Sequence, residues 1–262
     1  MAGKQEVPCE GAVVLRSGSN VIVHLRPSPV VARVMTGTVV LHEDPEGWLG
    51  REVGVLSYLA PFGLAVAPSP LVAPGPYCAD GLWMTFWEWV DHRGRAELGE
   101  PEPLGHALRE LHEALSGYSG ELAGFGDLGE DIERLRLALR PTAALSAERI
   151  DSLGERLRAL GETVFGLELP VQALHGDASL YNLLWTPAGP VWNDFEDTFR
   201  GPVHWDLAGF AMSLEFTGAD SAFVRRALDA YGFGDRRELA PFAEAHELYD
   251  EIWQLYDAQR RS

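Results

Sequence analysis

Three polar side chains between residues 177 and 194 have the types and the spacing of a site that binds a metal ion. Asp177 is followed by Asn182 and then, further along the chain, by Asp194. Between the last two runs the segment LLWTPAGPVW, in which short apolar runs flank a Pro-Ala-Gly-Pro turn, and this pattern predicts a β-hairpin. A hairpin brings its two ends together, so we expect Asn182 and Asp194 to lie side by side.

Such a pair of oxygen ligands suits Mg²⁺. This cation keeps several waters and is usually held by one or two protein groups together with the phosphates of a substrate. Asp177 precedes the hairpin, where a carboxylate can orient a hydroxyl nucleophile and accept its proton. A metal pair and a neighbouring carboxylate are the parts that phosphoryl transfer needs. Each residue alone has an ordinary interpretation as a turn residue, a strand end or a helix cap, whereas the ordered set favours chemistry.

The segments around these residues resemble a known family. HGDASLYN at 175–182, NDFED at 193–197 and WDLA at 205–208 are similar to the signature of the aminoglycoside phosphotransferase and choline kinase-like family, small-molecule relatives of the protein kinases. The resemblance implies an α+β, protein-kinase-like fold in two lobes. The N-terminal lobe, with a small antiparallel sheet, one helix and the linker that binds the nucleotide base, would span residues 1–90. A larger, mainly helical lobe for catalysis and acceptor binding would span residues 91–262.

The same resemblance assigns roles to residues of this chain. It implies that Asp177 is the catalytic aspartate and that Asn182 and Asp194 are the metal ligands. It further implies that Asp206 is a buried carboxylate that supports the catalytic loop, and that His175 holds this loop by hydrogen bonds.

The N-terminal part of the chain predicts a sheet with a phosphate-covering turn. Short β-rich runs, AVVLR, VIVHL and VVARVM, alternate with turns and predict three antiparallel strands. In kinases the first such turn covers the nucleotide phosphates with backbone N–H groups. Ser17, Gly18 and Ser19 occupy that turn here without a full G-x-G-x-x-G pattern, and a hairpin turn that binds no ligand would have the same sequence.

Kinases place a lysine on the third strand, where it binds phosphates and pairs with a glutamate of the next helix. The single lysine of this chain is Lys4, and Arg33 takes the matching place in VVARV. Arginine has a permanent charge and a two-pronged donor that fits phosphate oxygens. The segment GWLGREVGVLSYLAPFG has a helical stripe of apolar residues and offers Glu52 as the partner. Because an isolated buried charge is costly, we expect a pair instead of two ordinary surface ions.

The segment GLWMTFWEWVDH predicts an apolar strand and a turn, and it resembles the linker between kinase lobes where the nucleotide base docks. By this resemblance Trp87 and Trp89 contact the base, with Phe86 at the back of the pocket. The alternative is that these aromatic side chains only fill a core.

Apolar residues at helical spacing predict helices in PLGHALRELHEALSGY, DIERLRLALR and SAERIDSLGERLRALGETV, and in two C-terminal segments, SAFVRRALDAYG and ELAPFAEAHELYDEIWQLYDAQRR. In the family, the C-terminal helices and the segment before them line the acceptor site. The candidates for binding a cationic acceptor are therefore Glu196, Asp197, Asp250 and Glu251, although most carboxylates on such helices face water.

Composition narrows the classes of partner. A net charge of −18 and a pI near 4.8 argue against nucleic acid as a partner, whose phosphates need Lys and Arg, and favour cationic ligands. The alternative is that the acidic charge only serves solubility. No apolar run is long enough to span a membrane and no signal peptide is visible, so we expect a cytoplasmic protein that does not bind membranes. Two cysteines are too few for a disulfide framework. The sequence identifies no protein partner.

The expected activity is a transfer from ATP or GTP, with Mg²⁺, to a hydroxyl group of a small molecule. The segment between Asp194 and Asp206 is too short for the activation segment on which protein kinases bind peptides. Antibiotics such as aminoglycosides, sugars and amino alcohols all remain candidate acceptors. A second hypothesis is a kinase-like protein that binds nucleotide or antibiotic without turnover. A serine hydrolase is disfavoured, because no G-x-S-x-G motif occurs.

Overall fold

A computed structural model describes residues 7–18, 20–36, 44–93 and 99–261 of the chain. They group into two compact units, each built from segments that are distant in the sequence. The first unit is drawn from residues 1–99, 113–121 and 181–198, and the second from residues 100–112, 122–180 and 199–262. The expected lobe boundary at residue 90 stays a prediction.

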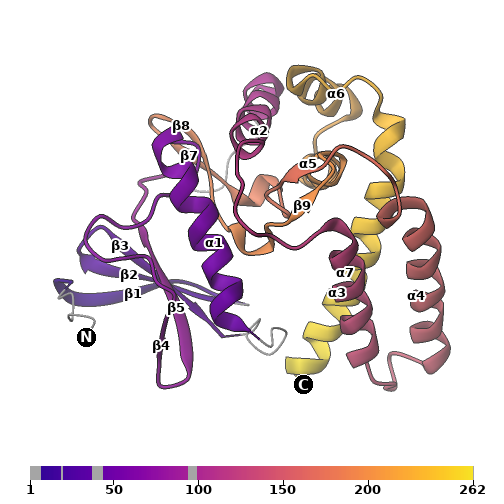
Figure 1. Cartoon of the computed structure of the whole chain (residues 1–262), viewed down its shortest axis with the longest axis horizontal. Coiled ribbons are helices and arrows are strands. Elements are labelled where there is room, and N and C mark those ends of the chain that lie inside the picture. The colour runs from indigo at the N-terminus through magenta and orange to yellow at the C-terminus, as the bar shows by residue number, and fades with distance from the viewer. Residues whose placement is uncertain (1–6, 19, 37–43, 94–98, 262) are drawn as a thin grey trace. The chain divides into compact units, whose positions relative to one another are not determined.

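The first unit contains a five-stranded antiparallel sheet in the order β1-β2-β3-β5-β4 (Figure 1). Its strands are β1 Cys9–Ser17, β2 Asn20–Pro27, β3 Val30–Met35, β4 Tyr77–Ala79 and β5 Leu82–Glu88. The three antiparallel strands predicted from AVVLR, VIVHL and VVARVM are confirmed. Arg33 pairs with Ile22 of β2 on one side and with Thr85 of β5 on the other, so its side chain leaves an inner strand.

Helix α1, Pro45–Leu59, packs against β5 of this sheet (Figure 1). Asp44 caps its start by accepting a hydrogen bond from the backbone N–H of Gly47 at 2.9 Å. Pro45 suits the first position, where a backbone N–H would have no partner within the helix. The buried face of α1 combines apolar side chains with Glu52. The apolar stripe therefore places one carboxylate inside the unit.

The predicted hairpin is confirmed as β7, Leu183–Thr186, and β8, Gly189–Trp192. Thr186 pairs with Gly189 at the turn, and Leu183 pairs with Trp192 at the open end. Two backbone hydrogen bonds join Trp192 to Leu64 and Val66, in the segment that follows α1. The hairpin is thereby fixed to the first unit at the end where the expected metal ligands lie.

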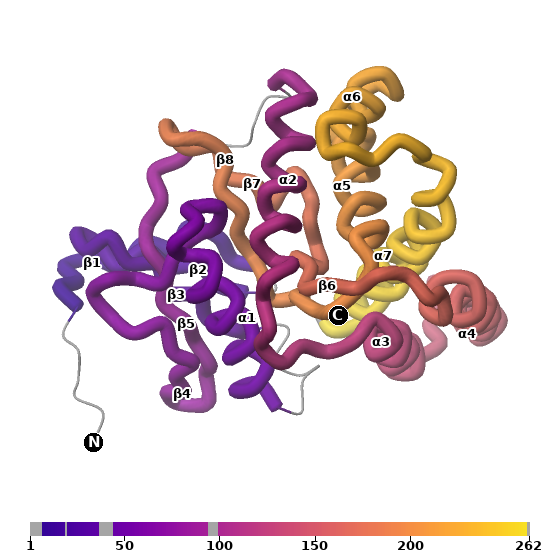
Figure 2. Tube along the Cα trace, turned by 45° about the horizontal axis from the view of Figure 1, so that its top comes forward, coloured from indigo at the N-terminus to yellow at the C-terminus, as the bar shows by residue number. Residues whose placement is uncertain are grey.

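The second unit is mainly helical, which with the sheet of the first unit gives the mixed α and β class that the resemblance implied. Helices α3, α4 and α5 all pack against the long helix α7, and α6 packs against α5 (Figure 2). The helices are α2 Pro101–Leu115 (this unit holds it up to His112), α3 Phe125–Ala138, α4 Ala147–Leu160, α5 His204–Phe216, α6 Ser221–Tyr231 and α7 Ala240–Arg261. Strand β6, Gln172–Ala173, pairs with β9, Arg200–Gly201.

The described residues of the two units also include short turns. The 3-10 turns lie at Ala60–Phe62, Leu180–Asn182, Phe195–Asp197 and Arg236–Leu239, and a π turn lies at Gly161–Phe165.

Helix α5 is the one long helix in the described part of the chain that the sequence pattern did not predict. Most of its residues are buried, on more than one face. A helix that is covered all round has no polar stripe, so the helical spacing of apolar residues disappears. Although α5 is apolar, neither it nor any other described helix has both the length and the apolarity needed to cross a membrane.

Candidate functional site

Arg33 is the centre of a buried charge cluster in the first unit. Only 5% of its surface is exposed. Its Nη1 atom donates a hydrogen bond to Oε1 of Glu52 at 2.6 Å. Because Glu52 is itself 2% exposed, the two charges compensate each other where water does not reach. The structure thus brings the predicted pair together.

Two further carboxylates face the other prong of the guanidinium, Nη2. Oδ1 of Asp194 lies 3.3 Å from this atom, and Glu196 forms an ion pair with it. Nη2 nevertheless has no aligned hydrogen-bond acceptor among the described residues. Asn20 also holds Glu196, because its Nδ2 donates to both carboxylate oxygens at 3.2 Å. Three carboxylates therefore surround one guanidinium, an excess of negative charge.

Burial shifts the protonation of this cluster. It raises the pKa of Glu52 to about 7, because desolvation of the carboxylate outweighs the attraction of Arg33. Burial likewise raises the pKa of Glu196. For Arg33, burial alone would lower the pKa, but the surrounding carboxylates outweigh it and raise the pKa. The guanidinium stays charged, while the carboxylates carry a surplus of negative charge that a bound cation would relieve.

Asp194 has a backbone conformation that is uncommon for residues other than glycine. Its φ of 68° lies in the left-handed region, which non-glycine residues seldom adopt and which often marks functional positions. Its buried Oδ1 atom accepts no hydrogen bond within the described ranges. A buried carboxylate oxygen without a donor is suited to a metal ion, which supplies the missing positive charge.

Asn182 lies next to this position across the open end of the hairpin. Its carbonyl accepts hydrogen bonds from the backbone N–H and the side-chain amide of Asn193, at 2.9 and 2.8 Å. One amide and one carboxylate fit Mg²⁺, which takes few protein ligands beside phosphates. A site of this kind needs only two protein ligands. It therefore agrees with the finding that no group of three or more His, Cys, Asp or Glu side chains is placed to hold a metal ion among the described residues, 7–18, 20–36, 44–93 and 99–261.

The turn between β1 and β2 contains the residues expected to cover phosphates. Ser17 and Gly18 are exposed, and Gly18 donates its N–H to the carbonyl of Asn20 at 3.1 Å. Ser19 lies outside the described residues. Because Asn20 also binds Glu196, the turn is connected to the Arg33 cluster. A contact of Ser17 and Gly18 with phosphate stays a prediction.

The two indoles proposed for the nucleotide base take part in packing within the first unit. Trp87 is buried, and its Nε1 donates to the hydroxyl of Thr85 at 2.9 Å. Trp89 stacks on His24, with ring centroids 4.2 Å apart, and its backbone N–H bonds to the carbonyl of Pro29. The core-filling alternative accounts for both side chains. Contacts with a base through the backbone stay a prediction.

In the second unit, Asp206 organises the loop that contains His175. Its Oδ2 accepts hydrogen bonds from the backbone N–H of His175 and from Nε2 of His112, both at 2.9 Å. Its Oδ1 accepts the backbone N–H of Gly176 at 3.0 Å. Burial by itself would raise the pKa of Asp206, but the hydrogen bonds and charges of the two histidines lower it. Tyr231 completes the network by bonding to Nδ1 of His112 at 2.8 Å.

Asp177 follows directly and is exposed at the tip of this loop. Its backbone N–H donates to Nδ1 of His175 at 3.3 Å. Gly176 has a φ of 90°, a conformation that favours glycine, and its carbonyl accepts the indole N–H of Trp205 at 2.8 Å. The loop is therefore fixed on the inside by buried groups, while one carboxylate is presented outward.

The four acidic candidates for acceptor binding lie in different surroundings. Glu196 belongs to the Arg33 cluster, and Asp197 is exposed in the same short turn. Glu251 forms ion pairs with two arginines of α4, Arg149 and Arg156. Asp250 interacts electrostatically with Asp177, and its side chain is partly exposed. The pKa of Asp250 is raised to about 6, mainly by desolvation and next by the negative charge of Asp177.

Comparison with known sequences decides the family. The sequence profile of a family described as the phosphotransferase enzyme family matches residues 18–242. The chain belongs to this family. The matched range contains the Arg33 cluster, the hairpin and the Asp206 network. No curated protein matches this phosphotransferase chain.

Solved phosphotransferases share the fold. The GDP and kanamycin complex of APH(2")-IIIa is 18% identical, with 98% of this chain and 89% of that chain covered and a TM-score of 0.72. An amicoumacin kinase in complex with AMP-PNP and Ca²⁺ is 13% identical, with 93% of this chain and 80% of that chain covered and a TM-score of 0.73. Choline kinase LicA from Streptococcus pneumoniae is 17% identical, with 97% of this chain and 88% of that chain covered and a TM-score of 0.68. At these identities the likeness concerns the fold.

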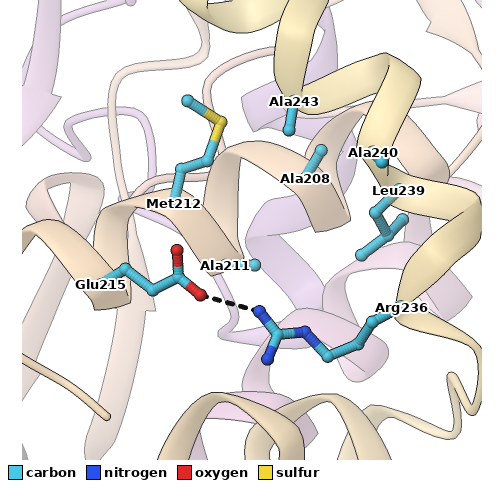
Figure 3. Close-up of a pocket in the computed structure, with 8 residues that line it drawn as sticks. All are labelled: Ala208, Ala211, Met212, Glu215, Arg236, Leu239, Ala240 and Ala243. Carbon is cyan, nitrogen blue, oxygen red and sulfur yellow. Dashed lines mark hydrogen bonds and ion pairs between the residues drawn. The ribbon is translucent and has the colours of Figure 1, made fainter. Parts of the chain in front are cut away.

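The second unit of the phosphotransferase also contains a small pocket of about 200 Å³ between α5, α7 and the turn before α7 (Figure 3). Its lining is mostly aliphatic, and an ion pair of 2.7 Å between Glu215 and Arg236 lies at one side. The lining consists of Ala208, Ala211, Met212, Glu215, Arg236, Leu239, Ala240 and Ala243. None of these was predicted as a site residue, and the two charged side chains of the lining, Glu215 and Arg236, pair with each other, so we do not assign the reaction to this pocket.

Two contributions escaped the sequence analysis. Neither Asn20 nor His112 is among the predicted site residues. The available signals are the place of Asn20 directly after the phosphate-covering turn and the place of His112 within a predicted helix. Their partners, Glu196 and Asp206, are 176 and 94 residues away in the sequence, and no local pattern reports such a distance.

Proposed function

We propose that this protein transfers the γ-phosphoryl group of a nucleoside triphosphate to a hydroxyl group of a small molecule. The observation that carries the proposal is the buried Arg33–Glu52 ion pair with the unsatisfied carboxylate oxygen of Asp194 beside it. Phosphoryl transfer in a member of this family needs a cationic side chain that binds phosphate and lies next to a metal ligand. Here Arg33 is the cationic side chain, and Glu52 holds it in place.

In this proposal Arg33 binds the phosphates, aided by backbone N–H groups of the turn at Ser17, Gly18 and Ser19. Asn182 and Asp194 would hold Mg²⁺, which supplies positive charge to the phosphate oxygens when bound. Trp87 and Trp89 mark the place of the base. GDP and AMP-PNP each occur in a solved relative, so both ATP and GTP belong in the test.

Asp177 orients the acceptor and accepts the proton of its hydroxyl group. The acceptor oxygen then bonds to the γ-phosphorus while the bond from that phosphorus to the bridging oxygen breaks, which leaves a phosphate ester and a nucleoside diphosphate. In a loose transition state, positioning supplies most of the acceleration, so a weak base suffices. The hydrogen bonds of Asp206 to the backbone of His175 and Gly176 support this positioning.

The acceptor that the charges favour is a small molecule with both a hydroxyl group and an amine. Asp250 is the strongest of the acidic candidates, because its carboxylate lies within the field of Asp177. Glu251 and Glu196 already face arginines, and Asp197 is retained as a peripheral candidate. Kanamycin, amicoumacin and choline in the names of solved relatives are consistent with an acceptor of this kind.

A second candidate function is a protein that binds nucleotide without turnover. The observation that favours it is that both prongs of Arg33 already face carboxylates, which compete with phosphate. Steady consumption of nucleotide in the presence of an acceptor would exclude it.

The deciding experiment incubates the protein with Mg²⁺, ATP or GTP, and a panel of aminoglycosides, other antibiotics, choline and sugars. Mass spectrometry then detects a gain of one phosphoryl group. Asp177→Asn, which changes one oxygen for an amide, serves as the control. Transfer by the wild type and none by the variant supports the proposal. Nucleotide binding without transfer to any class of acceptor would favour the second candidate.

A further inference from the structure

Glu196 is held by two donors that come from different strands. Arg33 Nη2 reaches it from β3, and Asn20 Nδ2 reaches it from the start of β2. The side chain of Glu196 is 11% exposed. A guanidinium and an amide that converge on one buried carboxylate form an anion-binding site.

The chemistry of this site suits a phosphate oxygen as well as a carboxylate. Both anions accept charge-assisted hydrogen bonds from a guanidinium, and the fork of arginine fits either. Arg33 is only 5% exposed, and its Nη2 atom is buried. This atom nevertheless has no aligned hydrogen-bond acceptor among the described residues. The ion pair with Glu196 thus leaves a buried donor incompletely satisfied, which a better-placed oxygen can correct.

The two prongs of Arg33 have separate roles in this arrangement. Glu52 holds Nη1 at 2.6 Å in good hydrogen-bond geometry, which orients the guanidinium. Nη2 is left as the prong for an exchangeable anion. Asp194 is a poorer holder than Glu196, since its oxygen stands 3.3 Å away and no hydrogen bond from Asn20 to it is seen within the described ranges.

We propose that Glu196 and a phosphate group of the nucleotide compete for Nη2 of Arg33 and Nδ2 of Asn20, so that Glu196 limits the affinity of the protein for nucleotide. This inference rests on the proposed function, in which Arg33 binds the phosphates. Phe195 anchors the short turn that contains Glu196, because its side chain is fully buried.

The competition predicts that nucleotide binds more tightly when the carboxylate is removed. If the donors are available in only about one molecule in ten, the apparent dissociation constant is about tenfold higher than the intrinsic one. Glu196→Gln keeps the shape and removes the charge. Glu196→Asp keeps the charge but withdraws it from both donors by one methylene group, so it separates loss of contact from loss of charge.

The test is calorimetric titration of the full-length protein with ADP, GDP and inorganic tripolyphosphate. Wild type, Glu196→Gln and Glu196→Asp are compared with Glu10→Gln, which removes one exposed negative charge from the first unit. We expect about tenfold tighter binding for Glu196→Gln, a smaller tightening for Glu196→Asp, and no change for Glu10→Gln. Thermal melts confirm that each variant is folded.

Equal or weaker binding by Glu196→Gln would overturn the competition. So would an equal tightening by Glu10→Gln, or wild-type binding by Glu196→Asp, because either result would indicate a general charge effect. The proposed function fails separately, if wild type binds neither nucleotide. In that case tighter binding of tripolyphosphate by Glu196→Gln would still support the competition, and no binding by any variant would reject both.

Discussion

Glu52 and Asp206 are the most deeply buried carboxylates among the described residues, one in each unit, yet their surroundings differ. Asp206 is fully buried and accepts hydrogen bonds from two backbone N–H groups and from His112. Glu52 is 2% exposed, binds Arg33 with Oε1, and its Oε2 has no donor among the described residues. Accordingly the pKa of Asp206 is lowered, whereas burial raises the pKa of Glu52 to about 7.

In the proposed function, this difference separates a structural carboxylate from one that takes part in a ligand site. Asp206 has a full set of donors, so its ionised form stabilises the fold. Glu52 shares its arginine with two other carboxylates, so the cluster around it is short of positive charge and of donors. Strained or incompletely satisfied groups are expected where a ligand completes the site. The predictions that follow test this contrast, in order of decreasing effect.

Among the variants that test this contrast, Asp194→Ala is expected to have the largest effect on turnover. The change removes a carboxylate from the incompletely satisfied cluster, and we expect turnover to fall by about a thousandfold because electrostatic stabilisation of the phosphates is lost. The Mg²⁺ dependence of nucleotide binding should disappear as well, as calorimetry with and without the metal can measure. Mg²⁺-dependent binding that survives in the variant would contradict the assignment.

Asp206→Asn is expected to destabilise the fold by about 3 kcal/mol. The amide replaces an oxygen that now accepts hydrogen bonds, so a donor would face the N–H groups of His175, Gly176 or His112. Chemical denaturation measures the change in the free energy of unfolding. A loss of less than about 1 kcal/mol would remove Asp206 from its supporting role.

Glu52→Gln is expected to change stability by less than about 1 kcal/mol near neutral pH, because the hydrogen bond to Arg33 survives and the surplus charge falls. The pH dependence sharpens the contrast. A folded pKa of about 7, above the ordinary value of 4.5 for a glutamate, means that the folded state binds more protons between these values, so wild type loses stability as pH rises through them.

The variant should lose less stability than wild type over this pH range, because only the contribution of Glu52 is removed. Melting temperatures recorded without nucleotide or metal at about pH 5 and about pH 8 provide the measurement. Glu46→Gln, on an exposed position of the same helix, is the control and should retain the wild-type pH slope. Identical slopes in wild type and Glu52→Gln would show that Glu52 is not the group responsible.

Asp250→Asn is expected to have the smallest effect, a rise of a few-fold in KM for an amine-bearing acceptor, as exposed ion pairs contribute little. Since the pKa of Asp250 is raised to about 6, the difference from wild type should be present above this pH and vanish below it. Glu251→Gln, one residue along and paired with arginines, is the control. An equal rise for both variants would remove Asp250 from the acceptor site.

Local patterns in the sequence predicted most of the helices and strands and identified the polar residues of the candidate site. Alternating apolar residues predicted the strands and the hairpin, and the apolar stripe predicted α1 with Glu52. Long-range contacts were not predictable in the same way. The family resemblance assigned Glu196 to the acceptor because it lies in the segment before the C-terminal helices, whereas the fold brings it to Arg33 and Asn20. Helix α5 was missed because burial on more than one face removes its periodicity.

The central claim is that one exposed carboxylate on a rigid loop orients the acceptor while the other unit's charge cluster binds nucleotide. The most direct measurement compares Asp177→Asn with wild type, once an acceptor is known, in a single-turnover assay and in nucleotide titrations. The account predicts that phosphoryl transfer falls by at least about a thousandfold while the dissociation constant for nucleotide changes by less than about threefold. Transfer at the wild-type rate in the variant would contradict it.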